Sequence, residues 1–285
     1  MYKSFKDLLK INRVAPARDF LIELQGAAKI YIKIGAPSVA HWTNQKEQAV
    51  GRALILINQY KVTQVRPFLL ALLDARDRNV ITQTIFIGII LNLETFHFTF
   101  SNLCQERASG LEGTYTRSAK SLHLAGTDKV KAKEVISLLN ANLIKKAPSK
   151  EKISASLKKL TFSKSNESDK KTIQIVFRKI ELFLLGTNEL QPGNFSLEHI
   201  HDQAHNDDWS AYIGNLIPLD EVINSGIKAG TTFKNKKKKY EKSSFKIVEF
   251  FLKENPQDIW TKADSEKWAI ELSKKLTEAT KLRRI

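Results

Sequence analysis

Apolar residues at helical spacing fill the first two thirds of this chain, and this pattern limits its fold more than any other feature. The spacing is clear in residues 54–60 and 135–143, and Arg66–Leu73 continues it with Pro67 in a first helical turn, where a missing N–H costs little. No strand-like alternation and no internal repeat is visible before residue 186. The pattern predicts an N-terminal α-helical domain covering residues 1–186.

The most apolar segment, Thr84–Leu93, reads as part of a buried helix over Val80–Phe96. It is shorter than the roughly 20 residues that cross a bilayer. The N-terminus alternates charged and apolar residues and lacks the apolar run of a signal peptide. Cys104 is the only cysteine, which excludes an intramolecular disulfide. We therefore expect a cytoplasmic protein with no membrane partner.

The pattern changes after residue 186. Two glycines and a proline in Gly186–Gly193 indicate a linker, which we place at residues 187–195. Ser196–Ile200 and Ile213–Ile217 then read as short strands, Asp220–Ile227 as a short helix, and helices as the remainder. The predicted fold is mostly α, with a small α+β domain at residues 196–285. The polar segment Phe162–Lys171 is expected to be an exposed loop.

Basic residues are in large excess and are unevenly placed. The chain has 46 Lys and Arg against 30 Asp and Glu, a net charge of +16. The segment Arg117–Lys179 holds 16 of the basic residues and 5 acidic ones, and a second cluster surrounds Lys236–Lys239. Such an excess attracts polyanions, with nucleic acid the leading partner and an anionic membrane surface the second. The alternative is that the lysines cover ordinary solvated helix faces.

Only one part of the sequence gathers side chains suited to catalysis. His199 can act as a general base, because imidazole titrates near neutral pH. Glu198 and Asn224 offer hard oxygen ligands for Mg²⁺ or Mn²⁺, and Asn215 can hold the His199 ring. Neighbouring residues on a strand point to opposite faces, so Glu198 and His199 can share a site only if the strand bends or ends there.

These residues resemble the His-Asn-His (HNH) motif of ββα-metal nucleases, in which an acidic residue precedes the first His and an Asn-Leu pair is followed nine positions later by His or Asn. The closer resemblance is to the C-terminal nuclease domain of GmrSD-like, modification-dependent restriction endonucleases. It covers residues 196–280 well and the helical region before them more weakly. The residues that carry it are Glu198, His199, Ile200, Gln203, Trp209, Gly214, Asn215, Leu216, Asn224, Phe233, Lys236, Tyr240, Ser243 and Trp260.

The resemblance implies an HNH-type DNA endonuclease of a restriction or phage-defence system. His199 would be the general base and Asn215 would orient it, while Glu198 and Asn224 would bind a divalent metal, Mg²⁺ or Mn²⁺. Contacts to DNA phosphates would come from the lysines that follow, namely Lys228, Lys234, Lys236, Lys237, Lys238 and Lys239. The DNA would be foreign or modified.

This chain departs from the family pattern in three ways. Asp202 stands where a proline is usual, and the arginine usual in the last helix is not evident near Trp268–Ser273. The Asp-Gly-Gln-Gln-Arg motif of the family's N-terminal nucleotide-binding and sensing domain is also missing. We therefore expect a C-terminal half, whose sensing domain would lie on a missing segment or on a partner subunit, or else a degenerate remnant.

Two other functions stay open: a DNA-binding module with an inactive nuclease fold, and an RNase of the same fold. His201 and His205 flank the site and are expected at the surface rather than as metal ligands. Trp209 and Trp260 can stack on bases, but we expect them to pack the small core.

Overall fold

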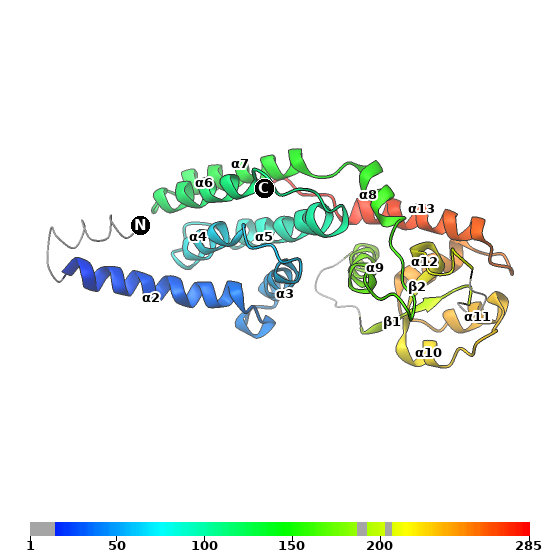
Figure 1. The fold of residues 1–285 in the computed structure, drawn as a ribbon. Coiled ribbons are helices and arrows are strands. Elements are labelled where there is room, and N and C mark those ends of the chain that lie inside the picture. The colour runs from blue at the N-terminus through cyan, green and yellow to red at the C-terminus, as the bar shows by residue number, and fades with distance from the viewer. Residues whose placement is uncertain (1–14, 187–192, 203–206) are drawn as a thin grey trace. The chain divides into compact units, whose positions relative to one another are not determined.

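The computed structural model describes residues 15–186, 193–202 and 207–285. Within them the chain forms two compact units, drawn as a ribbon in Figure 1. Of the described residues, unit 1 holds 15–94, 107–145 and 283–285, and unit 2 holds 95–106, 146–186, 193–202 and 207–282. This division does not follow the domain boundary expected at 187–195, because helices on both sides of that segment pack together in unit 2. Residues 187–192 of the expected linker lie outside the described residues.

Unit 1 is helical, as its sequence pattern predicts. Helix α4 packs against α2 and α6, and its apolar residues Phe68, Leu69 and Leu72 have no solvent exposure. The side-chain amides of Asn92 and Asn140 donate to the carbonyl oxygen of Arg283, which fixes the end of the chain in this unit. The elements of unit 1 are α2 (Ala15–Gly35), the 3₁₀ turn η1 (Val39–His41), α3 (Gln45–Gln59), α4 (Arg66–Asp77), most of α5 (Gln83–His97), α6 (Leu111–Leu124) and most of α7 (Lys129–Lys146).

Helix α5 is the apolar helix expected over Val80–Phe96, although it begins at Gln83. It runs directly into a π-helical segment, η2 (Phe98–Leu103), and the chain passes from unit 1 to unit 2 along this helix. The 21 residues Gln83–Leu103 are long and apolar enough to cross a membrane, but just over half of the apolar window is buried inside the protein. Ile89, Ile90 and Leu93 are fully buried, as in a core helix.

Unit 2 surrounds a two-stranded sheet with helices. Helix α13 packs against α8, α9 and η4, and α12 packs against α9 and β2. Its elements after η2 are α8 (Lys150–Leu157), α9 (Lys170–Leu185), β1 (Phe195–His199), the 3₁₀ turn η4 (Ile213–Asn215), β2 (Leu216–Asp220), α10 (Glu221–Ser225), α11 (Phe233–Tyr240), α12 (Lys246–Glu254) and α13 (Lys262–Ala279).

The sheet is an antiparallel pair in which Leu197 faces Pro218 and His199 faces Leu216. The second strand begins three residues later than predicted, because Ile213–Asn215 form the 3₁₀ turn. Pro218 is tolerated in β2 because a two-stranded sheet has only edge strands. The short helix predicted after it is α10.

A buried carboxylate from α9 fixes the start of α12. Glu181 accepts hydrogen bonds from the backbone amides of Lys246 at 2.9 Å and Ile247 at 2.8 Å. These are amides of a first helical turn, which have no partner inside their own helix. Burial raises the pKa of Glu181, while the two amide bonds oppose that rise. The contact ties α9, which precedes the expected linker, to α12, which follows it.

Candidate functional site

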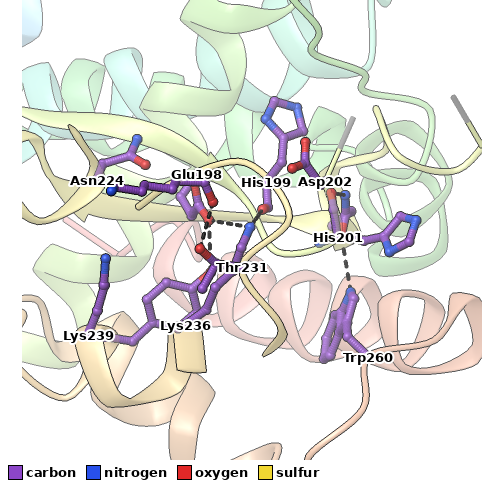
Figure 2. Close-up of polar contacts among 12 residues, drawn as sticks. Glu198, His199, His201, Asp202, Asn224, Thr231, Lys236, Lys239 and Trp260 are labelled. Atoms are coloured by element: carbon purple, nitrogen blue, oxygen red, sulfur yellow. Dashed lines mark hydrogen bonds and ion pairs between the residues drawn. The ribbon is translucent and has the colours of Figure 1, made fainter. Parts of the chain in front are cut away.

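The strand β1 places Glu198 and His199 on opposite faces, as the alternation of strand side chains requires. Glu198 meets α11, whereas His199 meets Phe162, which lies in the loop before α9. Figure 2 shows the His199 ring pointing away from Lys236, which belongs to α11. His199 is the last residue of β1, but the strand does not turn the two side chains into one cluster.

The ring of His199 is fixed by Phe162. Its Nε2 atom lies 2.9 Å from the carbonyl oxygen of Phe162, and the two rings stack with centroids 5.5 Å apart. A carbonyl only accepts, so Nε2 carries the hydrogen and Nδ1 carries the lone pair. Burial lowers the pKa of His199, the Phe162 bond opposes that shift, and the nearby charge of Lys236 adds to it. The imidazole is therefore neutral at neutral pH, which is the state a general base requires.

Glu198 lies in a buried polar cluster with α11. Lys236 Nζ lies 2.8 Å from Glu198 Oε1, and the hydroxyl of Tyr240 donates to the same oxygen at 3.1 Å. Lys236 also donates to the carbonyl oxygen of His199 at 2.6 Å and is only 3% exposed. The sequence predicted that Lys236 contacts a DNA phosphate, whereas in this structure its ammonium group is held by Glu198 and the His199 carbonyl. The reason is the helical repeat: Phe233, Lys236 and Tyr240 share the inward face of α11.

Asn215 is fully buried and braces the turn that follows β1. Its Oδ1 accepts from the backbone amide of His201 at 2.8 Å and from Trp260 Nε1 at 3.1 Å. Its Nδ2 donates to the carbonyl oxygens of His201 at 3.0 Å and Ser210 at 2.7 Å. The sequence predicted that Asn215 orients the His199 ring, whereas the hydrogen bonds of its amide hold the chain two residues further on, at His201. The preceding Gly214 lies against the backbone of Ser265, where a Cβ would collide with the carbonyl oxygen.

Asn224 lies beside β1, on the face that carries Glu198. Its Nδ2 donates to Ser196 Oγ at 2.6 Å, and Ser196 and Glu198 share a face because they are two residues apart. Glu198 Oε1 is occupied by Lys236 and Tyr240, and Oε2 makes no hydrogen bond with the described residues. A carboxylate oxygen and an amide oxygen are suitable ligands for Mg²⁺, which keeps several waters and takes few protein ligands. The oxygen atoms of Glu198 and Asn224 are therefore suitable ligands for a hard cation, whereas the positive charge of Lys236 opposes binding of that cation.

The described part of the chain contains no larger cluster of metal-binding side chains. Among residues 15–186, 193–202 and 207–285, no three His, Cys, Asp or Glu side chains gather as a metal site. Any divalent cation at Glu198 and Asn224 would depend on water and substrate oxygens for its remaining ligands.

Comparison with known proteins identifies this part of the chain. Residues 147–275 match the family model for the C-terminal domain of GmrSD restriction endonucleases. This region is a GmrSD-like C-terminal domain. The match begins almost where unit 2 resumes, at residue 146, and includes Phe162 as well as the hairpin. It supports a restriction endonuclease role with DNA as substrate. No curated protein matches the chain.

The lysines predicted to bind DNA differ in their surroundings in the GmrSD-like domain. Lys228 and Lys238 are exposed and make no hydrogen bond or ion pair through their side chains with the described residues. Lys234 pairs with Asp258 at 2.8 Å, and Lys237 donates to the backbone carbonyls of residues 256 and 257. Lys239 donates to the carbonyl oxygen of Gly226. Lys228 and Lys238 are thus the side chains of this set most available to phosphate.

Asp202, for which the resemblance predicted a proline, has a local structural role. Its carboxylate accepts from the backbone amide of Gly230 at 2.8 Å, joining the turn after β1 to the loop before α11. Next to it, His201 stacks on Trp209 with centroids 4.5 Å apart, and its Nε2 lies 2.7 Å from Asp207 Oδ2. His201 is thus half-buried rather than at the surface. Gln203 and His205 lie outside the described residues.

The tryptophan prediction is confirmed, since Trp209 and Trp260 are both buried. Phe162 and Tyr240, two further partners of the candidate site, were not predicted as such from the sequence. The sequence did contain a signal for Tyr240: it lies four residues after Lys236, on the same helix face as Phe233, and this spacing predicts that all three point inward. Phe162 had none, because any residue supplies a carbonyl and the stack of its ring on His199 depends on a loop that no local pattern places beside β1.

Proposed function

We propose that the GmrSD-like domain hydrolyses DNA phosphodiester bonds with His199 as the general base. One observation carries the proposal: the contact with the Phe162 carbonyl leaves Nδ1 with the lone pair, and burial keeps the ring neutral. A base needs this combination of fixed orientation and neutral charge to take a proton from water. The ring stack on Phe162 also limits rotation of the imidazole.

In this proposal Glu198 and Asn224 hold one divalent cation, Mg²⁺ or Mn²⁺. Because His199 lies on the opposite face of β1, the proposal requires the end of this strand to turn when DNA binds, so that the base and the cation reach one phosphate. When bound, such a cation stabilises negative charge on the phosphate and on the leaving oxygen. Lys228 and Lys238 bind the DNA backbone, and the excess basic charge of the chain raises the local concentration of DNA. The HNH subtype, a cytoplasmic location and a role in defence against foreign DNA belong to the proposal. So does a nucleotide-binding sensing domain on another segment or subunit.

Cleavage of supercoiled plasmid tests the proposal. The chain is incubated with plasmid and Mg²⁺ or Mn²⁺, beside His199→Ala, an EDTA control and His123→Ala, which changes an exposed histidine of unit 1. We expect relaxed or linear product from the unaltered chain and from His123→Ala, and none from His199→Ala or with EDTA. Equal cleavage by His199→Ala would refute the assignment of the base. Structured RNA cut in preference to plasmid would indicate an RNase.

A second candidate function is DNA binding without cleavage. The observation that favours it is the charge pairing of Glu198 with Lys236, on the strand face opposite His199. In that case a gel shift would show plasmid bound both with and without EDTA, while the plasmid stays supercoiled under every metal.

A further inference from the structure

The ammonium group of Lys236 is held inside unit 2 at the carboxylate of Glu198. The side chains of Lys236 and Glu198 are 4% and 10% exposed, and Nζ lies 2.8 Å from Oε1. Nζ also lies 2.6 Å from the carbonyl oxygen of His199, so two oxygens of β1 contact one lysine. Lysine ammonium groups are strongly hydrated and are buried only when paired. The pair is therefore a built part of the domain rather than a surface contact.

Tyr240 completes the arrangement from one turn further along α11. Its hydroxyl donates to Glu198 Oε1 at 3.1 Å. Burial, and next the charge of Glu198, raise the pKa of Tyr240 well above its ordinary value, so the hydroxyl stays a donor. Glu198 Oε1 thus receives two donors from a single helix, and one of them is a full positive charge.

The charges around Glu198 determine how strongly its carboxylate can bind a divalent metal ion in addition to Lys236. The pair of Glu198 and Lys236 is electrically neutral, and Asn224 adds no charge. A divalent cation at Glu198 would lie close to the buried ammonium group, where low solvent exposure weakens the screening of like charges. The charge of the Glu198 carboxylate is already balanced by Lys236, so a divalent cation binds it with less favourable electrostatic energy than it would bind an unpaired carboxylate.

We propose that the ammonium group of Lys236 is a permanent counter-charge to Glu198. It lowers the affinity of the Glu198 and Asn224 site for a divalent metal ion. The inference rests on the proposed function, since it takes Glu198 as a metal ligand. Without DNA the chain binds Mg²⁺ or Mn²⁺ weakly at this site, and removal of the Lys236 charge strengthens the binding. Lys236 acts through Glu198 and is a positioning residue.

Direct titration with Mn²⁺ tests this, with free Mn²⁺ followed by electron paramagnetic resonance in the absence of DNA. Lys236→Gln removes the charge and keeps a hydrogen-bond donor for Glu198. Lys238→Gln makes the same change at an exposed position of the same helix and is the matched control. We expect Lys236→Gln to bind one Mn²⁺ about tenfold more tightly than the unaltered chain, because one repelling charge is gone. Lys238→Gln should change the affinity less than about twofold, because solvent screens an exposed charge.

A double variant locates the effect. Adding Glu198→Gln to Lys236→Gln should return the Mn²⁺ affinity to that of the unaltered chain or weaker. Circular dichroism checks that each variant is folded. If Lys236→Gln does not fold, Lys236→Met, which keeps the length of the apolar stem, takes its place.

Several results would overturn the proposal. An unaltered chain that binds Mn²⁺ more tightly than about 10 µM, the weak end of the range for calcium sensor sites, would do so without any variant. So would a Lys236→Gln affinity equal to that of the unaltered chain, or a gain that survives Glu198→Gln. Because no cleavage is measured, these results are independent of the plasmid test, in which failure of His199→Ala to abolish cleavage removes the proposed base instead.

Discussion

Replacement of Asn215 by alanine should destabilise unit 2 strongly. The amide of Asn215 is fully buried and makes four hydrogen bonds, two through Oδ1 and two through Nδ2. The bonds to Trp260 Nε1 and to the carbonyl oxygen of Ser210 are buried, whereas the two to His201 are partly open to water. A buried polar group left without a partner costs about 1–3 kcal/mol, so the two buried bonds alone predict a loss of about 2–6 kcal/mol.

Asn215→Asp separates the hydrogen bonds from the shape of the side chain. The aspartate keeps the volume and one acceptor, but its second oxygen faces the carbonyl oxygens of His201 and Ser210 in place of a donor. Two acceptors facing each other in a buried site repel, so we expect a loss at least as large as for alanine. Asn235→Ala is the control, since Asn235 is exposed, and it should change stability by less than about 0.5 kcal/mol.

Urea unfolding followed by tryptophan fluorescence measures these losses. Three of the four tryptophans lie in unit 2, so the signal reports mainly on the unit that holds Asn215. A loss below about 1 kcal/mol for Asn215→Ala, or normal stability of Asn215→Asp, would refute the bracing role. A variant with normal stability but no cleavage would instead support the original expectation that Asn215 orients His199.

Three further results are expected. Burial lowers the pKa of His97 to about 4 from 6.5, so the folded state binds fewer protons than the unfolded state between these values. Stability of unit 2 should therefore fall by up to about 3 kcal/mol as the pH drops from 6.5 to 4, and His97→Gln, but not His123→Gln, should flatten urea unfolding curves taken across this range. Glu181→Ala leaves two backbone amides of α12 without their acceptor and should cost about 2–4 kcal/mol in the same assay; a loss under about 0.5 kcal/mol would contradict the capping role. If Lys228 and Lys238 each contact a phosphate, changing both to Ala should reduce the slope of log affinity against log salt by about 1.8, measured by fluorescence anisotropy on duplex DNA, and an unchanged slope would place the DNA elsewhere.

The helices of this chain follow from its sequence, because apolar residues at helical spacing leave few other ways to bury them. The hairpin was also predicted, but β2 begins late because Gly214 and Asn215 belong to a 3₁₀ turn that lets Ser265 approach closely. That approach depends on a helix 50 residues away, which no local pattern reveals.

The candidate site was predicted less well than the fold. Lysine is normally an exposed residue, so a run of them on α11 predicted a DNA-binding face. The inward position of Lys236 depends on its neighbours Phe233 and Tyr240 at helical spacing and on Glu198, which comes from a different element. The role of Phe162 could not be predicted, because any residue at that position supplies a carbonyl and the ring stack on His199 depends on how the loop before α9 packs against β1.

The Phe162 carbonyl has a consequence for any attempt to move this site to another protein. The two strands and the helix after them hold His199, Glu198 and Asn224, but the group that selects the tautomer of His199 comes from a loop more than 30 residues earlier in the chain. That loop is tied in place by Asp169, whose carboxylate accepts from the amide of Thr161 at 3.1 Å. The smallest transplantable unit therefore starts ahead of α9. A graft of the hairpin alone would carry His199 without the carbonyl that keeps the hydrogen on Nε2, so the tautomer of its ring would no longer be fixed.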